Sequence, residues 1–358
     1  RHVARLEGLF DRVEADARAP PFDPARTKKR RPMLSIDDDT AVMAKSRAAA
    51  LASCGGAMRA VDAVLRDGYG NAFACVRPPG HHATPTQAMG FCLFNNVGVA
   101  ALHARETYGV RRVAVVDVDV HHGNGTEAYF RDDAELFYAS FHQGGGDFYP
   151  GTGLSKGSAK IVNGARVAGE TGVARNVVNC PLAQGAGLRG VRRCLADKIL
   201  PALATFDPGL VIVSLGFDAL AKDPIGGLDL APGDYAEITK LVAAAAPAAK
   251  LVSVLEGGYD VREISRAAVA HVSALLDLAR APGAPPSPPR RPRGASAISD
   301  DSSGESWGSG QEYGAQSDDS DDLGLGDLAV ADDPPPPPEP AAKPPGALAR
   351  AFAFLKKT

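Results

Sequence analysis

The chain has 358 residues, of which 45% are hydrophobic, and its acidic and basic residues nearly balance at a formal net charge of -3. This length allows two average domains or one large α/β domain. Because phosphate binding requires clustered Lys and Arg, the overall charge gives no reason to expect direct nucleic-acid binding, and the lack of any run of about 18 apolar residues argues against a membrane span.

Residues 1–36 are expected to form an N-terminal segment that is partly loop. Its basic cluster, Lys28-Lys29-Arg30-Arg31, is typical either of a nuclear localisation signal or of a solvated loop. Because the sequence starts at Arg1, we expect an incomplete N-terminus, where an organelle-targeting segment would escape notice. Scattered cysteines without a CxxC pair predict reduced thiols in an intracellular protein of the nucleus or cytoplasm. These cysteines are Cys54, Cys75, Cys92, Cys180 and Cys194.

In residues 37–281, short β-branched runs alternate with longer stretches of helical period, which predicts a mostly parallel central sheet flanked by helices. The predicted strands are residues 72–76, 112–118, 136–141, 174–178, 210–215 and 251–255. The predicted helices are residues 43–67, 91–108, 188–204, 233–248 and 261–279. The strands are nearly all apolar, as burial on both faces requires.

Residues 282–346 are dominated by Pro, Gly, Ser and Asp, which predicts a disordered tail because such a segment buries too little apolar surface to offset its chain entropy. In residues 347–358, Leu348, Phe352 and Leu355 are spaced to share one helix face. This short helix could bind a protein partner, or it could be a frayed terminus or fold back on the core.

The strongest chemical signal is the strand-end sequence Val113-Ala-Val-Val-Asp-Val-Asp-Val-His. Because side chains alternate along a strand, Asp117, Asp119 and His121 face the same way. The carboxyl ends of parallel strands are where open α/β sheets bind ligands, and buried carboxylates are rare unless they are paired or hold a metal. This strand end is therefore a predicted functional site.

Two later strands end in the same manner, one in Asp218 and the other in Glu256-Gly-Gly-Tyr259. Asp119, His121 and Asp218 together supply three protein ligands, and three ligands with one open position are typical of catalytic zinc. Mixed nitrogen and oxygen ligands also suit iron, cobalt or manganese.

A Pro- and Gly-rich loop, Arg77-Pro-Pro-Gly-His81-His82, supplies two adjacent histidines. In a loop of this kind, unlike a strand, neighbouring side chains can reach one site. Since the metal already has three ligands, general acid–base work is the more economical role for the pair.

These motifs resemble the histone deacetylase family, within the arginase/deacetylase fold. The matching blocks occur in the family's order between about residues 37 and 276, at residues 77–83, 90–96, 117–126, 140–142, 148–153, 214–218, 226–227 and 256–259. The resemblance implies a three-layer α/β fold. Asn124 in place of an aspartate, with the Arg-Pro-Pro-Gly and Glu-Gly-Gly blocks, is similar to the class II branch.

The resemblance also implies the parts of the site. One Zn²⁺ would be bound by Asp119, His121 and Asp218, and the catalytic residues would be His81, His82, Asp117, Asn124 and Tyr259. Asp117 would orient His81 and Asn124 would orient His82, which would serve as the base that activates water. Tyr259 would donate to the oxyanion. The acyl-lysine tunnel would include Phe91, Tyr149, Gly90 and Asp39, and a structural K⁺ is expected at Asp117, Asp119, His121, Ser140 and Phe141.

The expected activity is zinc-dependent hydrolysis of Nε-acetyl-lysine in histones or other proteins. Acetylpolyamine amidohydrolases share nearly every block and remain an alternative, as does a non-catalytic scaffold or corepressor of the same fold. The binuclear arginase pattern would require further aspartates near Gly123 and Gly216, where this chain has glycine. The expected partners are acetylated proteins or peptides, with the tail as a second contact site.

Overall fold

The computed structural model describes residues 2–17, 33–145, 147–154, 160–162, 165–167 and 175–280. The basic cluster at residues 28–31, the tail predicted for residues 282–346 and the terminal helix predicted for residues 347–358 lie outside the described residues.

A six-stranded sheet in the order β3-β10-β9-β4-β5-β8 forms the centre of the fold. Every neighbouring pair of its strands is parallel, which confirms the predicted parallel sheet. The strands are β3 (Asn71–Ala74), β4 (Val113–Asp117), β5 (Leu136–Gln143), β8 (Val177–Leu182), β9 (Leu210–Leu215) and β10 (Lys250–Leu255). All six match predicted strands, although β8 lies a few residues later than the predicted 174–178.

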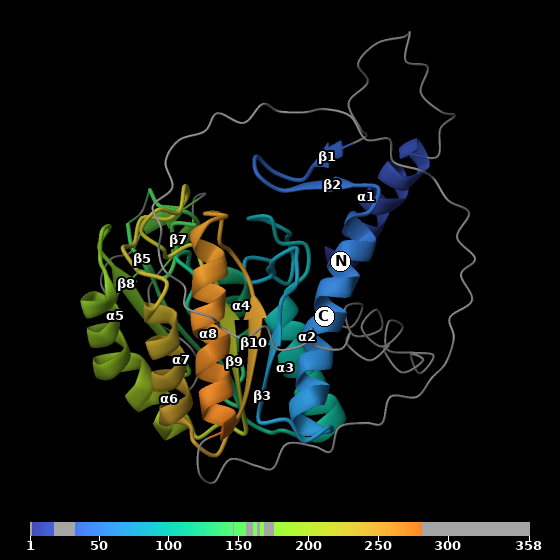
Figure 1. The fold of residues 1–358 in the computed structure, drawn as a ribbon. Coiled ribbons are helices and arrows are strands. Elements are labelled where there is room, and N and C mark those ends of the chain that lie inside the picture. The colour runs from blue at the N-terminus through green and yellow to red at the C-terminus, as the bar shows by residue number, and fades with distance from the viewer. Residues whose placement is uncertain are drawn as a thin grey trace, which may run out of the picture. The chain divides into compact units, whose positions relative to one another are not determined.

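Helices cover both faces of this sheet (Figure 1). On one side lie α2 (Ser46–Leu65), α3 (Asn96–Tyr108) and α4 (Asn124–Phe130), and on the other α5 (Leu188–Cys194), α6 (Leu200–Phe206), α7 (Asp234–Ala245) and α8 (Glu263–Arg280). Alternation along β4 explains the two cores. Val113 and Val115 belong to the core beneath α2 and α3, whereas Ala114 and Val116 belong to the core beneath α5 to α8.

The helix predicted at residues 91–108, which is α3, starts later than predicted. Gly90 and Phe91 both have positive φ, at 57° and 64°, which an α-helix cannot include. The helix instead begins at Asn96, and the side chain of Asn95 caps it by accepting the Gly98 N–H at 2.7 Å. The predicted helix at residues 188–204 is α5 and α6 joined by a π-helical turn, Leu195–Ile199.

The N-terminal segment contains a helix that was not predicted, α1 (His2–Ala17). Its buried residues Val3, Leu6, Phe10 and Val13 recur at helical spacing and pack in a third core with residues of α2 and the region before α3. The Phe10 and Phe94 rings, for example, lie 6.5 Å apart edge to face. Two hairpins were also not predicted: β1 (Met33–Ser35) with β2 (Ala41–Met43), and β6 (Lys160–Val162) with β7 (Ala165–Val167).

Among the described residues, α2 is long and apolar enough to cross a membrane by length and composition, with 20 residues and a mean hydropathy of 1.3. Helices in protein cores meet the same criteria, so this is weak evidence for a span. In this fold α2 packs against α3 and β3, and its residues Cys54, Ala57 and Val61 are fully buried. Its apolar character is therefore explained by the core.

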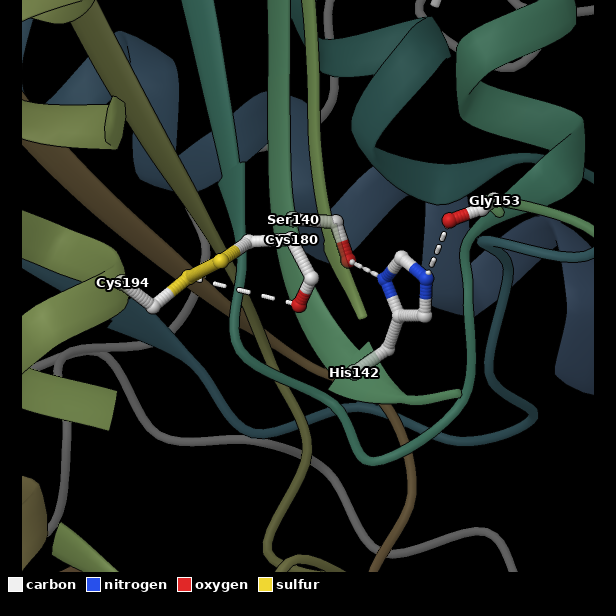
Figure 2. The surroundings of a disulfide bond; sticks show 5 residues. All are labelled: Ser140, His142, Gly153, Cys180 and Cys194. Carbon is white, nitrogen blue, oxygen red and sulfur yellow. Dashed lines mark hydrogen bonds between the residues drawn. A yellow bond between two sulfur atoms is a disulfide. The ribbon is translucent and has the colours of Figure 1, made fainter. Parts of the chain in front are cut away.

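The expectation that all cysteines are thiols is wrong for one pair. Cys180 within β8 and Cys194 at the end of α5 form a disulfide, with their Cα atoms 6.1 Å apart (Figure 2). The two are separated by 14 residues in sequence, and the pair forms because α5 folds back against the edge strand that precedes it. Cys54, Cys75 and Cys92 are free thiols, as predicted.

Candidate active site

The three predicted metal ligands meet at one point of the sheet edge. β4 and β9 are parallel neighbours with Asp117 opposite Ser214, so the residues that follow both strands emerge side by side. The ligand atoms of Asp119, His121 and Asp218 lie within 4.8 Å of one another, and all three residues are buried. His121 Nδ1 is 3.0 Å from Asp119 Oδ1 and 3.2 Å from Asp218 Oδ2.

This group has the chemistry of a cation site. Asp218 Oδ2 is buried and has no well-aligned hydrogen-bond donor, although the His121 ring nitrogen lies 3.2 Å away, and burial raises the pKa of this carboxyl to about 7. A buried carboxylate oxygen without a good hydrogen bond is costly, and a bound cation would remove that cost. The other ligand oxygens are fixed by the backbone, because Asp218 Oδ1 accepts the Val120 N–H at 2.9 Å and Asp119 Oδ2 accepts the Gly257 N–H at 3.0 Å. The residues present therefore fit a metal ion.

Close packing explains why glycine stands where a second metal would need carboxylates. A Cβ atom at Gly216 would lie 2.1 Å from Asp119 Oδ2, and one at Gly123 would lie 2.1 Å from Asp117 Oδ2. Both distances are far shorter than a van der Waals contact. Neither position has room for an aspartate, which favours a single metal ion.

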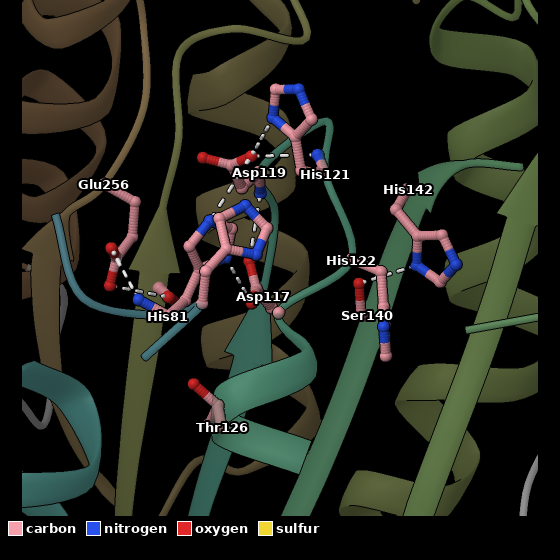
Figure 3. Close-up of polar contacts among 12 residues, drawn as sticks. His81, Asp117, Asp119, His121, His122, Thr126, Ser140, His142 and Glu256 are labelled. Atoms are coloured by element: carbon pink, nitrogen blue, oxygen red, sulfur yellow. Dashed lines mark hydrogen bonds and ion pairs between the residues drawn. The ribbon is translucent and has the colours of Figure 1, made fainter. Parts of the chain in front are cut away.

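The two histidines of the predicted pair contact the partners expected for them. His81 Nδ1 lies 3.1 Å from Asp117 Oδ2 (Figure 3). His82 Nδ1 lies 2.8 Å from Asn124 Oδ1. Burial and the neighbouring His81 and His121 hold the pKa of His82 well below its usual range. Burial has the same tendency at His81, but the carboxylates of Asp119 and Asp117 outweigh it and raise the pKa of His81. The two rings therefore differ in electrostatic environment although they are adjacent in sequence.

A pocket of about 310 Å³ opens onto the ligand group. All four residues predicted for the tunnel line it, together with the histidine pair and Tyr259. Four further lining residues were not predicted as site residues: Pro79, Phe148, Ile225 and Gly257. Pro79, Phe148 and Gly257 lie within matching blocks of the sequence, and Ile225 directly precedes the Gly226-Gly227 block.

Aromatic rings form the walls of this pocket. The Phe148 ring stacks on the imidazole of His121 with centroids 5.0 Å apart, and Tyr149 meets His82 edge to face at 5.0 Å. On the other wall, Phe91 and Tyr259 lie 5.9 Å apart. Glycine is required at position 90, because φ is positive there and an added Cβ atom would lie 2.5 Å from the His82 ring and 2.8 Å from the Tyr149 hydroxyl.

Two of the residues expected to bind K⁺, Asp119 and His121, are also the predicted metal ligands, and the other three lie on the neighbouring strands β4 and β5. Asp117 pairs with Ser140 across β4 and β5, and Ser140 is fully buried with its hydroxyl 2.9 Å from His142 Nδ1 (Figure 3). Phe141 is the next residue along β5 and is fully buried. The potassium site itself stays a prediction.

Residues 1–275 match the family model for the histone deacetylase domain. This chain belongs to the histone deacetylase family. The chain is 38% identical over 274 residues to Histone deacetylase clr3 of Schizosaccharomyces pombe, covering 75% of this chain and 38% of clr3. It is 39% identical over 226 residues to Polyamine deacetylase HDAC10 of Mus musculus, covering 63% of this chain and 33% of HDAC10. The chain thus spans less than half the length of these two curated relatives.

The fold is confirmed by a solved relative. The crystal structure of the HDA15 HD domain matches with a TM-score of 0.64 and 35% identity, covering 76% of this chain and 71% of that domain. The chain therefore has the three-layer arginase/deacetylase fold, and its family is one of hydrolases that act on acetylated substrates.

Proposed function

We propose that this histone deacetylase family member is a zinc-dependent enzyme that hydrolyses the amide of Nε-acetyl-lysine in proteins or peptides. The observation that carries the proposal is the convergence, in one pocket, of the buried ligand group, the histidine pair and Tyr259. A non-catalytic scaffold would have no need to keep all three parts.

In this proposal Asp119, His121 and Asp218 hold one Zn²⁺, which supplies Lewis acidity toward the amide carbonyl and makes water more acidic. His82 removes the proton from the attacking water and later protonates the leaving amine. Because Nδ1 of His82 contacts Asn124, Nε2 is the atom left for this proton transfer. The hydroxyl of Tyr259 donates a hydrogen bond to the oxyanion as it forms.

The shape of the pocket supports an acyl-lysine substrate. The apolar stem of a lysine can lie between the rings of Phe91 and Tyr149, while the acetyl group reaches the ligand group. Asp39 is exposed at the mouth, where its carboxylate could accept N–H groups of a peptide backbone. The exposed apolar Ile225 beside the same mouth favours a peptide over a polycationic polyamine.

The decisive experiment compares zinc-loaded protein on acetyl-lysine peptides and on N-acetylated polyamines, with Tyr259→Phe and His82→Ala as controls. We expect peptide hydrolysis in the wild type and a loss of about 10²- to 10³-fold in Tyr259→Phe. Undiminished peptide turnover in both variants would rule out the mechanism. Turnover of polyamines alone would rule out the lysine substrate and favour the activity for which the mouse relative is named.

The proposal includes a catalytic domain that spans residues 37–281. Helix α1, residues 2–17, precedes this range but packs against α2, so it adds to the hydrophobic core. The structural K⁺ is also part of the proposal, and removal of potassium from the buffer would test it through activity and thermal stability.

A further inference from the structure

The buried carboxylate of Asp223 joins two loops that line the pocket. Its Oδ1 accepts the backbone N–H groups of Ile225 at 3.0 Å and Gly226 at 3.1 Å. Its Oδ2 accepts the N–H groups of Tyr259 at 2.7 Å and Asp260 at 3.3 Å. One oxygen therefore closes the turn of its own loop, and the other binds a loop 36 residues later in the chain.

Both loops contribute directly to the pocket. The first runs from the metal ligand Asp218 to Ile225 at the mouth, and the second carries Gly257 and Tyr259. The first loop is folded tightly, because a Cβ atom at Gly226 would lie 1.9 Å from the carbonyl oxygen of Asp218. Asp223 thus links the backbone of Tyr259 to the segment that presents a ligand.

The loop before Tyr259 needs such an anchor. Gly257 and Gly258 precede the tyrosine, and Gly258 has a φ of 128°. Because glycine can adopt many backbone conformations, the two residues alone do not fix the path of the loop. The ring of Tyr259 is contacted by the guanidinium of Arg77, 5.6 Å from the ring centroid. Asp223 fixes the backbone of the same residue from the opposite loop.

We propose that Asp223 is a positioning residue, which holds Tyr259 at the height in the pocket where its hydroxyl meets the developing oxyanion. The inference rests on the proposed deacetylase function. A competing explanation is that Asp223 only closes its own turn, as aspartates commonly do through a side-chain bond to a backbone N–H two residues on. The two explanations differ in what happens to Tyr259 when Oδ2 alone is lost.

Asp223→Asn separates them, because the amide oxygen can still close the local turn while the NH₂ group cannot accept the Tyr259 N–H. The matched control is Asp260→Asn in the adjacent position. Asp260 Oδ1 accepts the N–H groups of Arg262 and Glu263, which an asparagine oxygen can also do.

Hydrogen exchange measured by mass spectrometry on the full chain gives the first readout. In Asp223→Asn we expect faster exchange, by about tenfold or more, in peptides covering residues 257–261, with little change in residues 223–227. The Asp260→Asn control should leave both peptides near wild type. Faster exchange confined to residues 223–227, or no change in either peptide, would overturn the proposal.

Steady-state kinetics on an acetyl-lysine peptide give the second readout. We expect Asp223→Asn to lower kcat by about 10- to 100-fold with little change in KM, because displacement of a catalytic group by about 1 Å has effects of this size. In a Tyr259→Phe background the same change should add almost nothing. Multiplicative losses in the double variant would contradict the positioning role, because they would show that Asp223 acts independently of the tyrosine.

A second variant guards against poor folding. Asp223→Ser keeps a hydroxyl that can close the local turn but is too short to reach the Tyr259 N–H, and it should give the same exchange and kinetic pattern. Failure of both variants to fold would overturn the proposal, because Asp223 would then be required for folding as a whole. If the wild type hydrolyses no acetylated substrate, the proposed function fails, while the exchange experiment still decides whether Asp223 holds Tyr259.

Discussion

The carboxylate of Glu256 accepts the backbone N–H of His81 at 3.1 Å, so a side chain at the end of β10 fixes the loop that carries the histidine pair. The same oxygen accepts the Gly80 N–H at 2.6 Å, and the other accepts the Ser214 hydroxyl at 3.1 Å. Glu256 is fully buried, and burial raises the pKa of its carboxyl to about 7. Glu256 therefore serves as the hydrogen-bond acceptor for three donors from two other segments of the chain.

We predict opposite outcomes for two substitutions of Glu256. Glu256→Ala removes the acceptor for two N–H groups and should lower kcat by about 10²-fold, because the histidines shift. Glu256→Gln should stay within about threefold of wild type, since an amide oxygen accepts both N–H groups and the NH₂ group can donate to Ser214. Rates on an acetyl-lysine peptide, compared at equal folded fraction, provide the measurement. Equal loss in both variants would show that the negative charge is what matters.

Gly216→Ala should abolish metal binding. Its Cβ would lie 2.1 Å from Asp119 Oδ2, so the ligand must move. Zn²⁺ stoichiometry by elemental analysis and the rise in Tm on adding Zn²⁺ should both fall toward zero, because stabilisation by a ligand requires binding to the folded state. Gly55→Ala is the control: it lies within α2 with no atom within 4 Å of the added methyl group, and it should keep full stoichiometry. Normal zinc content in Gly216→Ala would show that the ligand group is not the metal site.

The sequence was most informative where a signal is local. Asp117, Asp119 and His121 lie within a few residues of one another, and strand alternation alone places them on one face. Asp218 could be assigned to the same site because parallel strands end at a common edge of the sheet. In the structure Asp117 lies opposite Ser214, so β4 and β9 do end side by side. The apolar runs of the six sheet strands were equally readable, because strands buried on both faces contain few polar residues.

Residues that act through distant contacts could not be predicted in this way. Asp223 is separated from Tyr259 by 36 residues, and only the folded chain shows that its Oδ2 accepts the Tyr259 N–H. Ile225 has no polar or reactive group that would mark it in the sequence, and its place at the mouth of the pocket follows from the turn that Asp223 closes. Helix α1 is a different case, because Leu6, Phe10 and Val13 are spaced as a helix face and this local pattern can be read from the sequence.

The buried His271 should make the protein less stable in acid. Its ring bonds to the hydroxyls of Thr239 at 2.7 Å and Ser253 at 3.0 Å, and burial lowers its pKa from 6.5 to about 4. Between these two values the unfolded chain binds a proton that the folded protein excludes. The stabilisation is therefore complete above pH 6.5 and is lost as the pH falls toward 4, by roughly 1.4 kcal/mol per pH unit.

Removal of this imidazole should make the free energy of unfolding depend less on pH under acidic conditions. We expect His271→Asn to be less stable than wild type at pH 7.5, where the two hydroxyl contacts are lost, but to lose less stability between pH 6.5 and 4.5. Urea unfolding at a series of pH values provides the measurement. Parallel curves for the two proteins across this window would mean that His271 titrates alike in the folded and unfolded states.

Ile225→Glu should shift substrate preference toward cationic amides. Ile225 is 41% exposed at the mouth of the pocket, where the side chain of Asp39 is also exposed. A second carboxylate there would attract the ammonium groups of an N-acetylated polyamine, and a preference of about tenfold in relative kcat/KM corresponds to only about 1.4 kcal/mol. The uncharged Ile225→Gln is the matched control, and it should leave the ratio of polyamine to peptide turnover near wild type.

Because the effect is electrostatic and the position is exposed to solvent, added salt should reduce the effect in Ile225→Glu alone. A ratio that changes equally in both variants would assign the effect to shape, and charge at the mouth would then have no part in substrate choice.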